Sequence, residues 1–178
     1  AGYVATIGGR IVANSEIPGQ RFHFTVLDSP IVNAFALPGG YVYVTRGLIA
    51  LANNEAELAS VLAHEVGHVA ARHTAQRYNR AMGMALGGAV LGAVIGNQIV
   101  SDLVQQGGQL YLLSYSRQQE YESDQLGVRY LVRAGYDPYA EADFLRSLDA
   151  QDALEAALNQ DKNRRPSEFL MTHPITAK

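Results

Sequence analysis

The chain has 178 residues, enough for one domain with a substantial core, and its 48% hydrophobic and 17% charged residues are typical of a globular protein. The net charge is −3 and the sequence holds no basic cluster, which argues against nucleic acid as a partner. The chain has no cysteine, so disulfides and thiolate metal sites are excluded, and any metal site must use histidine and carboxylate side chains. We therefore expect a single domain over residues 1–178.

The N-terminal part of the chain predicts one helix followed by three strands. Residues 3–13 carry apolar side chains at near-helical spacing, which predicts a short first helix. Three runs rich in β-forming residues, over 22–27, 32–37 and 41–45, are separated by tight turns and predict a small antiparallel meander. His23 lies in the first run and is expected to be a strand surface residue rather than a metal ligand.

Residues 54–74 predict one helix that carries the sequence His64-Glu65-Val66-Gly67-His68. On a helix His64 and His68 present two imidazoles to one point, which is the geometry that a zinc ion needs. Glu65 lies about 100° further round the axis, so its carboxylate reaches a metal-bound water without being a ligand. The opposite, apolar face is expected to be buried and consists of Leu58, Leu62, Val66 and Val69. The alternative is a helix with two surface histidines.

The predicted helix does not itself supply a third ligand. A metzincin would carry one ten residues after the first histidine, but that position is Thr74. His73 lies about half a turn away from His64, so it does not join the same metal if the helix continues. The third ligand must come from another part of the chain.

The segment after this helix is unlike the rest. From Ala81 to Gly96 it contains no charged or polar side chain, and its glycines recur at the spacing that lets helices touch backbone to backbone. We expect a helical arm or flap within the domain, over residues 81–108, packed near the active site; the alternative is a membrane-inserting element. Residues 81–100 are the candidate region for association with a membrane or with envelope proteins.

Residues 109–133 predict a long helix on which Glu120 and Asp124 share a mostly apolar face, and helices follow over 139–158 and 167–171. A carboxylate on an apolar face needs a partner, and zinc would supply one for Glu120. Asp124, one turn on, is placed to accept the free ring N–H of a ligating histidine. Glu122 lies on the opposite, solvated side. The alternative is an ordinary surface pair of acidic residues.

Together these motifs resemble the CAAX prenyl protease family of zinc metallopeptidases. The matching stretches are Asn33-Ala34-Phe35-Ala36-Leu37-Pro38-Gly39-Gly40, Asn54-Glu55-Ala56-Glu57-Leu58-Ala59, His64-Glu65-Val66-Gly67-His68, Glu120-Tyr121-Glu122-Ser123-Asp124 and Thr172-His173-Pro174. The resemblance implies a mainly helical α+β gluzincin domain with a small antiparallel sheet and with His64, His68 and Glu120 as ligands of one zinc ion. It also points to the soluble bacterial branch of this family, whose members lie in the periplasm or cell envelope and are tied to protein quality control at the outer membrane. Ser123 departs from the family, which more often has alanine there.

Two further segments are candidates for roles at the site. The strand with Asn33, Ala34 and Phe35 is expected to be an edge strand beside the metal, onto which an extended peptide adds, although Phe35 in a purely structural strand would fill the core. Pro174 restricts His173 to an extended backbone, which suits a side chain projected from a loop. His173 is then either a fourth metal ligand that keeps the enzyme latent or a group that stabilises the oxyanion, and the alternative is a surface histidine.

The sequence thus predicts a zinc metalloendopeptidase that hydrolyses misfolded or envelope proteins by Glu65-assisted attack of a zinc-bound water. One rival is a peptidase fold that binds unfolded proteins as a chaperone or scaffold without turnover. A second is a membrane-associated structural element built on the Ala/Gly-rich segment.

Overall fold

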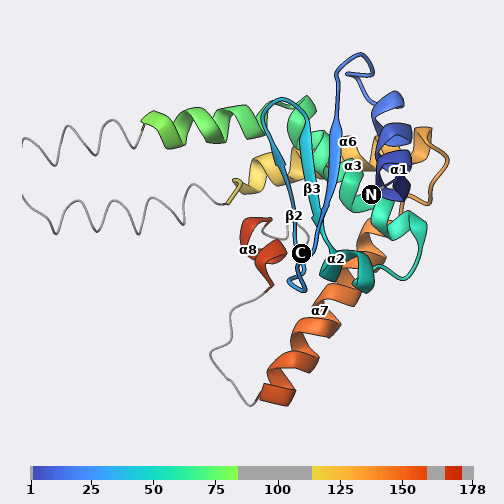
Figure 1. The fold of residues 1–178 in the computed structure, drawn as a ribbon, viewed down its shortest axis with the longest axis vertical. Coiled ribbons are helices and arrows are strands. Elements are labelled where there is room, and N and C mark those ends of the chain that lie inside the picture. The colour runs from blue at the N-terminus through green and yellow to red at the C-terminus, as the bar shows by residue number, and fades with distance from the viewer. Residues whose placement is uncertain (1, 84–113, 160–166, 174–178) are drawn as a thin grey trace, which may run out of the picture.

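The computed structural model describes residues 2–83, 114–159 and 167–173, which form a mainly helical α+β fold with one small sheet (Figure 1). The elements are α1 (Gly2–Ala13), β1 (His23–Leu27), β2 (Ala34–Leu37), β3 (Tyr41–Thr45), α2 (Arg46–Leu51), α3 (Glu55–Ala70), α6 (Arg117–Arg133), α7 (Ala140–Asn159) and α8 (Glu168–Thr172). Residues 73–83 are also helical. The predicted α+β class is confirmed, while the predicted arm over 81–108 lies, from residue 84 on, outside the described residues.

The sheet is mixed rather than antiparallel, and its strand order is β1-β3-β2. β2 and β3 form the predicted hairpin, with Gly39 and Gly40 at positive φ in the turn, but β1 pairs parallel to β3. The expected meander was wrong in this respect, because alternating patterns fix which face of a strand is buried and not which strand is its neighbour. The loop between β1 and β2 contacts the chain just after β3, where the Gly47 N–H donates to the Ser29 carbonyl at 2.9 Å.

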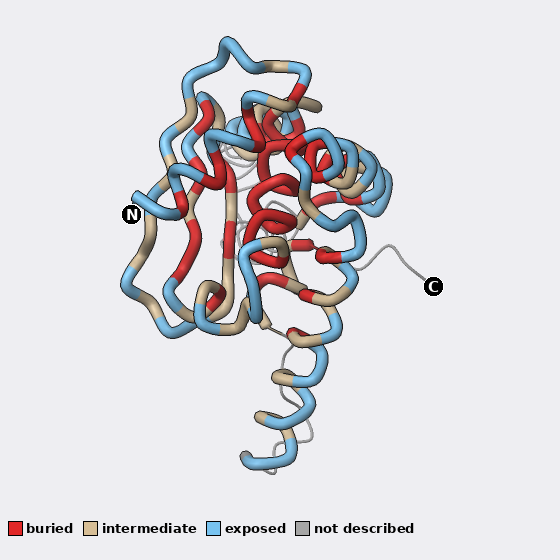
Figure 2. Tube along the Cα trace, turned by 90° about the vertical axis from the view of Figure 1, so that its right-hand side faces the viewer, coloured by how far each residue is buried: buried red, intermediate tan, exposed pale blue. Residues whose placement is uncertain are grey.

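Helix α3 lies at the centre of the molecule, between the sheet on one side and α6 and α7 on the other (Figure 2). Every residue from Glu57 to Val69 is buried, including the predicted apolar face. The inner face of the sheet packs on α3 through small and β-branched side chains, namely Ala34, Ala36, Val42 and Val44. The helix with the histidine motif therefore lies in the core of the fold, and packed side chains surround its polar residues.

Two helix boundaries differ from the predictions by several residues, and one helix was not predicted. α3 ends at Ala70 and not at Thr74, because Arg72 adopts a left-handed conformation with φ 60°. α6 begins at Arg117, where Ser116 caps it, so the predicted start at residue 109 was too early. α2 was not predicted at all; it is short and is capped by the Thr45 side chain, which accepts from Leu48 N. Of the helices in the described ranges, none has the length and hydrophobicity needed to cross a bilayer.

Candidate metal centre

Helix α3 brings two imidazoles together inside the protein. Asn54 caps the helix by accepting from the Glu57 N–H, and the histidines follow in its last two turns. The Nε2 atoms of His64 and His68 lie 3.0 Å apart, and both side chains are buried. The alternative of two surface histidines is therefore ruled out, and both ring nitrogens face one point.

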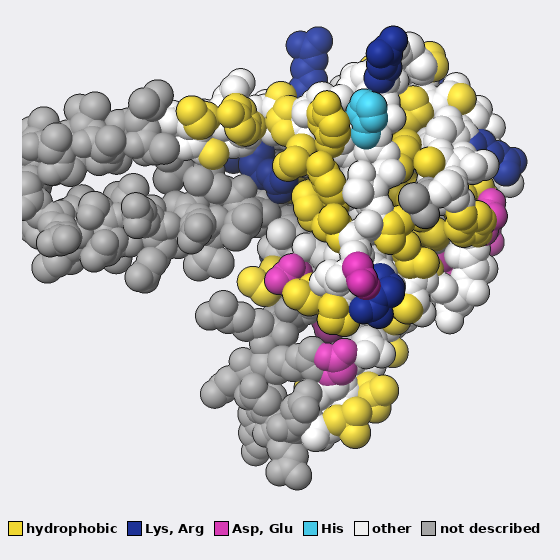
Figure 3. Space-filling model, in the orientation of Figure 1, with side chains coloured by type: hydrophobic (Ala, Val, Ile, Leu, Met, Phe, Trp, Pro, Cys, Tyr) yellow, Lys and Arg dark blue, Asp and Glu magenta, His cyan; other side chains and the backbone are white. Residues whose placement is uncertain are grey.

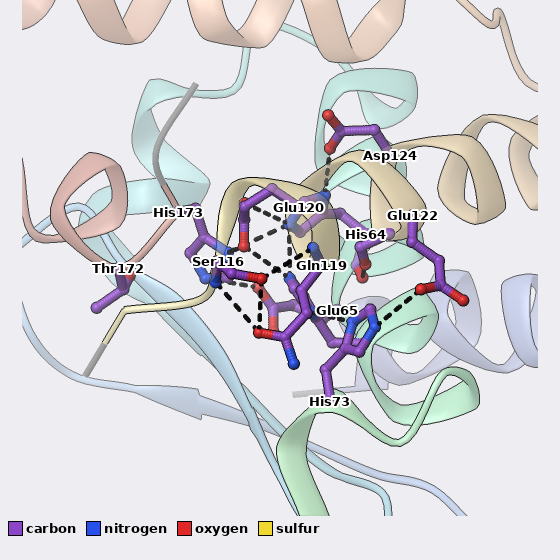
Figure 4. Close-up of polar contacts among 12 residues, drawn as sticks. His64, Glu65, His73, Ser116, Gln119, Glu120, Glu122, Asp124, Thr172 and His173 are labelled. Carbon is purple, nitrogen blue, oxygen red and sulfur yellow. Dashed lines mark hydrogen bonds and ion pairs between the residues drawn. The ribbon is translucent and has the colours of Figure 1, made fainter. Parts of the chain in front are cut away.

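Helix α6 carries Glu120 to that point. Its Oε1 atom lies 3.2 Å from His68 Nε2 and its Oε2 atom lies 3.4 Å from His64 Nε2 (Figure 4). The capping box formed by Ser116 and Gln119 fixes the start of α6 at Arg117, three residues before Glu120. The predicted third carboxylate is thus in contact with both predicted histidines.

Small residues allow α6 to approach α3 closely enough for this contact. A Cβ atom on Gly67 would lie 2.9 Å from the Ser123 carbonyl oxygen, and one on Gly127 would lie 3.2 Å from the His64 backbone nitrogen. The Ser123 hydroxyl donates to the His64 carbonyl at 2.6 Å. The serine that departs from the family pattern therefore helps to join the two ligand helices.

His173 also reaches the cluster, from the end of α8. Its Nδ1 atom lies 3.2 Å from His64 Nε2 and 3.3 Å from Glu120 Oε1. Its Nε2 atom lies 3.3 Å from Glu65 Oε1, and the ring stacks on Phe169. The alternative of a surface histidine is excluded, because His173 is buried among the other side chains of the site.

The donor set fits a metal ion. One ligand atom from each of His64, His68, Glu120 and His173 lies within 4.8 Å of the others, and all four residues are buried. Glu65 is fully buried, and apart from the 3.3 Å approach of His173 Nε2 its carboxylate oxygens have no hydrogen-bond partner in the described part of the chain. Burying converging ring nitrogens and carboxylates is costly unless a cation is shared among them. Imidazole nitrogen and carboxylate oxygen without thiolate are the ligands of catalytic zinc sites.

The electrostatics of the site follow from burial and from the carboxylates. Burial alone would lower the pKa of His64, but Asp124, Glu120 and Glu141 outweigh it and raise that pKa well above the usual value. His68 has less carboxylate around it, so burial holds its pKa well below the usual value. Burial alone would raise the pKa of Glu120, but its contacts with His173, His64 and His68 have the larger effect and lower that pKa below its usual value. The carboxylate is therefore ionised. An ionised carboxylate is the form that binds a metal.

Further side chains surround the ligands. Asp124 Oδ1 lies 2.9 Å from His64 Nδ1, as the sequence suggested, and Glu141 Oε1 from α7 lies 3.5 Å from the same atom. The Tyr115 ring stacks on His68 with centroids 3.8 Å apart. Sequence reasoning missed Tyr115 and Glu141, because they precede or follow the predicted motifs and reach the site only through the packing of α6 and α7.

Two surfaces adjoin the cluster. A cavity of about 230 Å³ lies between α3, α6, α7 and α8 and is lined by His64, Glu120 and His173 together with apolar side chains such as Val128, Leu145 and Phe169. On the other side of α3, β2 is an edge strand of the sheet. Phe35 is not in the core, because it points away from α3 and stacks on Tyr43 with centroids 5.0 Å apart.

The outer face of the sheet is rich in apolar side chains, which Figure 3 shows in yellow. A shallow depression on this face is lined by Leu37, Pro38, Tyr41, Tyr43 and Tyr78. Tyr41 and Tyr78 are largely exposed there. The edge strand is therefore accompanied by an aromatic surface.

Comparison with known proteins agrees with this geometry. The model of peptidase family M48 matches residues 1–178. The chain is 34% identical over 182 residues to a β-barrel assembly-enhancing protease of Yersinia pestis, covering 97% of this chain and 36% of that protein. It is 39% identical over 169 residues to the mitochondrial metalloendopeptidase OMA1 of Arabidopsis thaliana, covering 93% of this chain and 32% of that protein. It is 32% identical over 178 residues to OMA1 of Schizosaccharomyces pombe, covering 99% of this chain and 50% of that protein. The chain thus spans between a third and a half of these relatives.

Proposed function

The chain belongs to peptidase family M48, and from that premise we propose that it is a zinc metalloendopeptidase that hydrolyses peptide bonds within polypeptides. The observation that carries this proposal is the buried convergence of His64, His68 and Glu120 beside the buried carboxylate of Glu65. The similar proteins whose names state an activity are called proteases. This favours turnover over a chaperone or scaffold that only binds.

In the proposed mechanism His64, His68 and Glu120 hold the zinc ion. When bound, zinc supplies a Lewis acid that polarises the peptide carbonyl and makes water easier to deprotonate. Glu65 takes the proton from the attacking water and passes it to the nitrogen of the leaving amine. The carboxylate suits this role because it is fully buried beside the cluster, and its one close polar contact is His173 Nε2, 3.3 Å from Oε1.

We propose that His173 occupies the fourth ligand position and keeps the enzyme latent. This is supported by its Nδ1 atom, which lies among the ligand atoms of the cluster. A neutral imidazole competes well with water for zinc, and a side chain at the end of a short helix is able to swing away. The rival role, stabilisation of the oxyanion, would need His173 to act on the substrate rather than on the metal.

Substrate is proposed to bind along the edge strand. Ala34 and Phe35 begin β2 and Asn33 directly precedes it, and the outer edge of β2 has no strand partner within the described sheet. An extended peptide is able to pair with this edge through its backbone, so side-chain selectivity would be loose. The cavity against His64 and His173 suits an apolar side chain of a substrate, because most of its lining is apolar.

The proposed setting is the periplasm or cell envelope, near the outer membrane. A relative is named for enhancing β-barrel assembly, and we extend this setting to the present chain, with misfolded envelope proteins as the substrates. Association through residues 81–100 remains a prediction from composition, since residues 84–113 lie outside the described part of the chain.

Cleavage of an unfolded polypeptide such as casein tests the function. The purified chain should cleave it, should lose activity when a chelator strips the metal, and should regain activity with one equivalent of zinc. Binding of casein without any cleavage by the zinc-loaded protein would favour the scaffold instead.

A further inference from the structure

His73 and Glu122 form a chain of contacts that leads from the proposed metal site to the protein surface. His68 turns its Nε2 atom to the cluster, and its Nδ1 atom lies 3.1 Å from His73 Nδ1. On the far side of the second ring, His73 Nε2 lies 3.3 Å from Glu122 Oε2, the contact drawn dashed in Figure 4. The order is therefore metal site, His68, His73, Glu122.

An unusual backbone turn makes this chain of contacts. A continuous helix would carry His73 about 140° round the axis from His68, away from the ring. Instead the helix stops at Ala70, and Arg72 is the only non-glycine residue with positive φ in the described part of the chain. Such a conformation costs about 1–2 kcal/mol and is retained where the surroundings require it. Here it folds His73 back onto the last turn of α3.

The two contacts are compatible with only one arrangement of ring protons. A histidine that binds a metal through Nε2 carries its proton on Nδ1, so His68 must donate at that atom. His73 Nδ1 must then accept, which places the second proton on His73 Nε2. That proton points to the Glu122 carboxylate, which is an acceptor. Each ring nitrogen in the chain thus has a defined role.

Burial shows that His73 is held for these contacts. The residue is 2% exposed, so its ring nitrogens depend on partners within the protein. A neutral ring is the form that is able to accept at one nitrogen and donate at the other. The Glu122 side chain is 53% exposed, so the chain of contacts ends in solvent.

We propose that His73, supported by Glu122, is a positioning residue that fixes the orientation of His68 toward the metal. This inference rests on the proposed metal site and goes beyond it. His64 Nδ1 faces the Asp124 carboxylate directly, whereas His68 reaches its carboxylate through an interposed imidazole. In both metal-facing histidines the Nδ1 atom, which points away from the metal site, thus has a partner, as is usual for ligating histidines.

The test measures zinc affinity by competition with a chromophoric chelator. His73→Leu removes the acceptor and should weaken zinc binding by about 10–100-fold, the usual scale for a group that orients a ligand. His73→Asn keeps an acceptor, because Asn Oδ1 lies the same number of bonds from the backbone as His Nδ1, and it should recover most of the loss. Glu122→Gln should cost only a few-fold, because the carboxylate is half exposed. His23→Leu, which removes an exposed imidazole on β1, is the matched control and should bind as wild type does.

The outcomes separate the inference from the proposed function. If the wild-type protein binds no zinc, the metal site itself is wrong. If it binds zinc and His73→Leu binds within twofold of it, or if the Leu and Asn variants are equally weak, the positioning role is wrong. Should His73→Leu fail to fold, His73→Ala, which also removes the acceptor, decides the question through the visible absorption of the cobalt-substituted protein, which reports ligand geometry. A cobalt spectrum of His73→Ala identical to that of wild type would overturn the inference.

Discussion

Replacing Gly67 by alanine tests whether the close packing of α3 against α6 sets the position of Glu120. The new Cβ atom would lie 2.7 Å from Ser123 Oγ and 2.9 Å from the Ser123 carbonyl oxygen, where ordinary contact begins at 3.4 Å. The serine hydroxyl is able to rotate, but the carbonyl belongs to the backbone of α6. The helices must therefore separate locally by about 0.5 Å, one turn away from Glu120.

The expected effects follow from that displacement. Alanine is about 1 kcal/mol better than glycine inside a helix, but overpacking a core costs about 1–3 kcal/mol, so the metal-free protein should be destabilised. Metal–ligand distances tolerate about ±0.2 Å, so a ligand carried on a helix that moves further should be held poorly. We expect zinc affinity to fall by about 10–100-fold, as when other groups that position ligands are disturbed.

Thermal unfolding of the metal-free protein and chelator competition for zinc measure both effects. Gly9→Ala is the control: Gly9 lies within α1, its Cβ would meet nothing within 4 Å, and the change should raise stability by about 0.5–1 kcal/mol. Adding Ser123→Ala to Gly67→Ala removes one of the two short contacts and should recover only part of the zinc affinity. The reasoning is refuted if Gly67→Ala is as stable as Gly9→Ala and binds zinc as tightly as wild type.

Three other predictions concern the proposed ligands and the groups around them. Glu120→Gln should strip most of the zinc, because it removes a ligand, whereas Glu122→Gln should leave the metal in place; metal analysis showing the reverse would contradict the ligand assignment. Asp124→Asn should weaken zinc binding or activity by about 10–100-fold, because it removes the carboxylate behind His64, and an unchanged zinc dissociation constant with an unchanged rate would show that Asp124 is not needed. His173→Ala should raise basal proteolysis if the imidazole holds the enzyme latent, and a rate lowered by about 10²-fold would instead assign it to the oxyanion.

The sequence predicted the helices that carry the candidate ligands because their signals are local. The spacing of His64 and His68 and the apolar stripe behind them depend only on helical periodicity, and the structure has both on α3. Glu120 could be selected because an acidic residue on an apolar face needs a partner. The α+β class followed in the same way from alternating and helical patterns.

The parts that the sequence did not predict depend on contacts between distant segments. The alternation of apolar and polar residues does not determine which strands are neighbours, so it could not place β3 between β1 and β2. His73 was excluded as a ligand on the assumption of a continuous helix, and it does not join the metal cluster, but the left-handed Arg72 gives it a contact with His68 that periodicity does not reveal. Glu141 approaches His64 only because α7 packs on α3.

The account's central claim is that Glu65 acts as the base at a zinc site that it does not help to hold. The most direct measurement compares wild type and Glu65→Gln for zinc content and for the rate of casein cleavage in the same preparations. The account expects equal zinc, equal thermal stability of the loaded protein and a rate lowered by about 10²–10⁴-fold, because only the proton acceptor is lost. Cleavage by Glu65→Gln at the wild-type rate, or loss of its zinc, would contradict it.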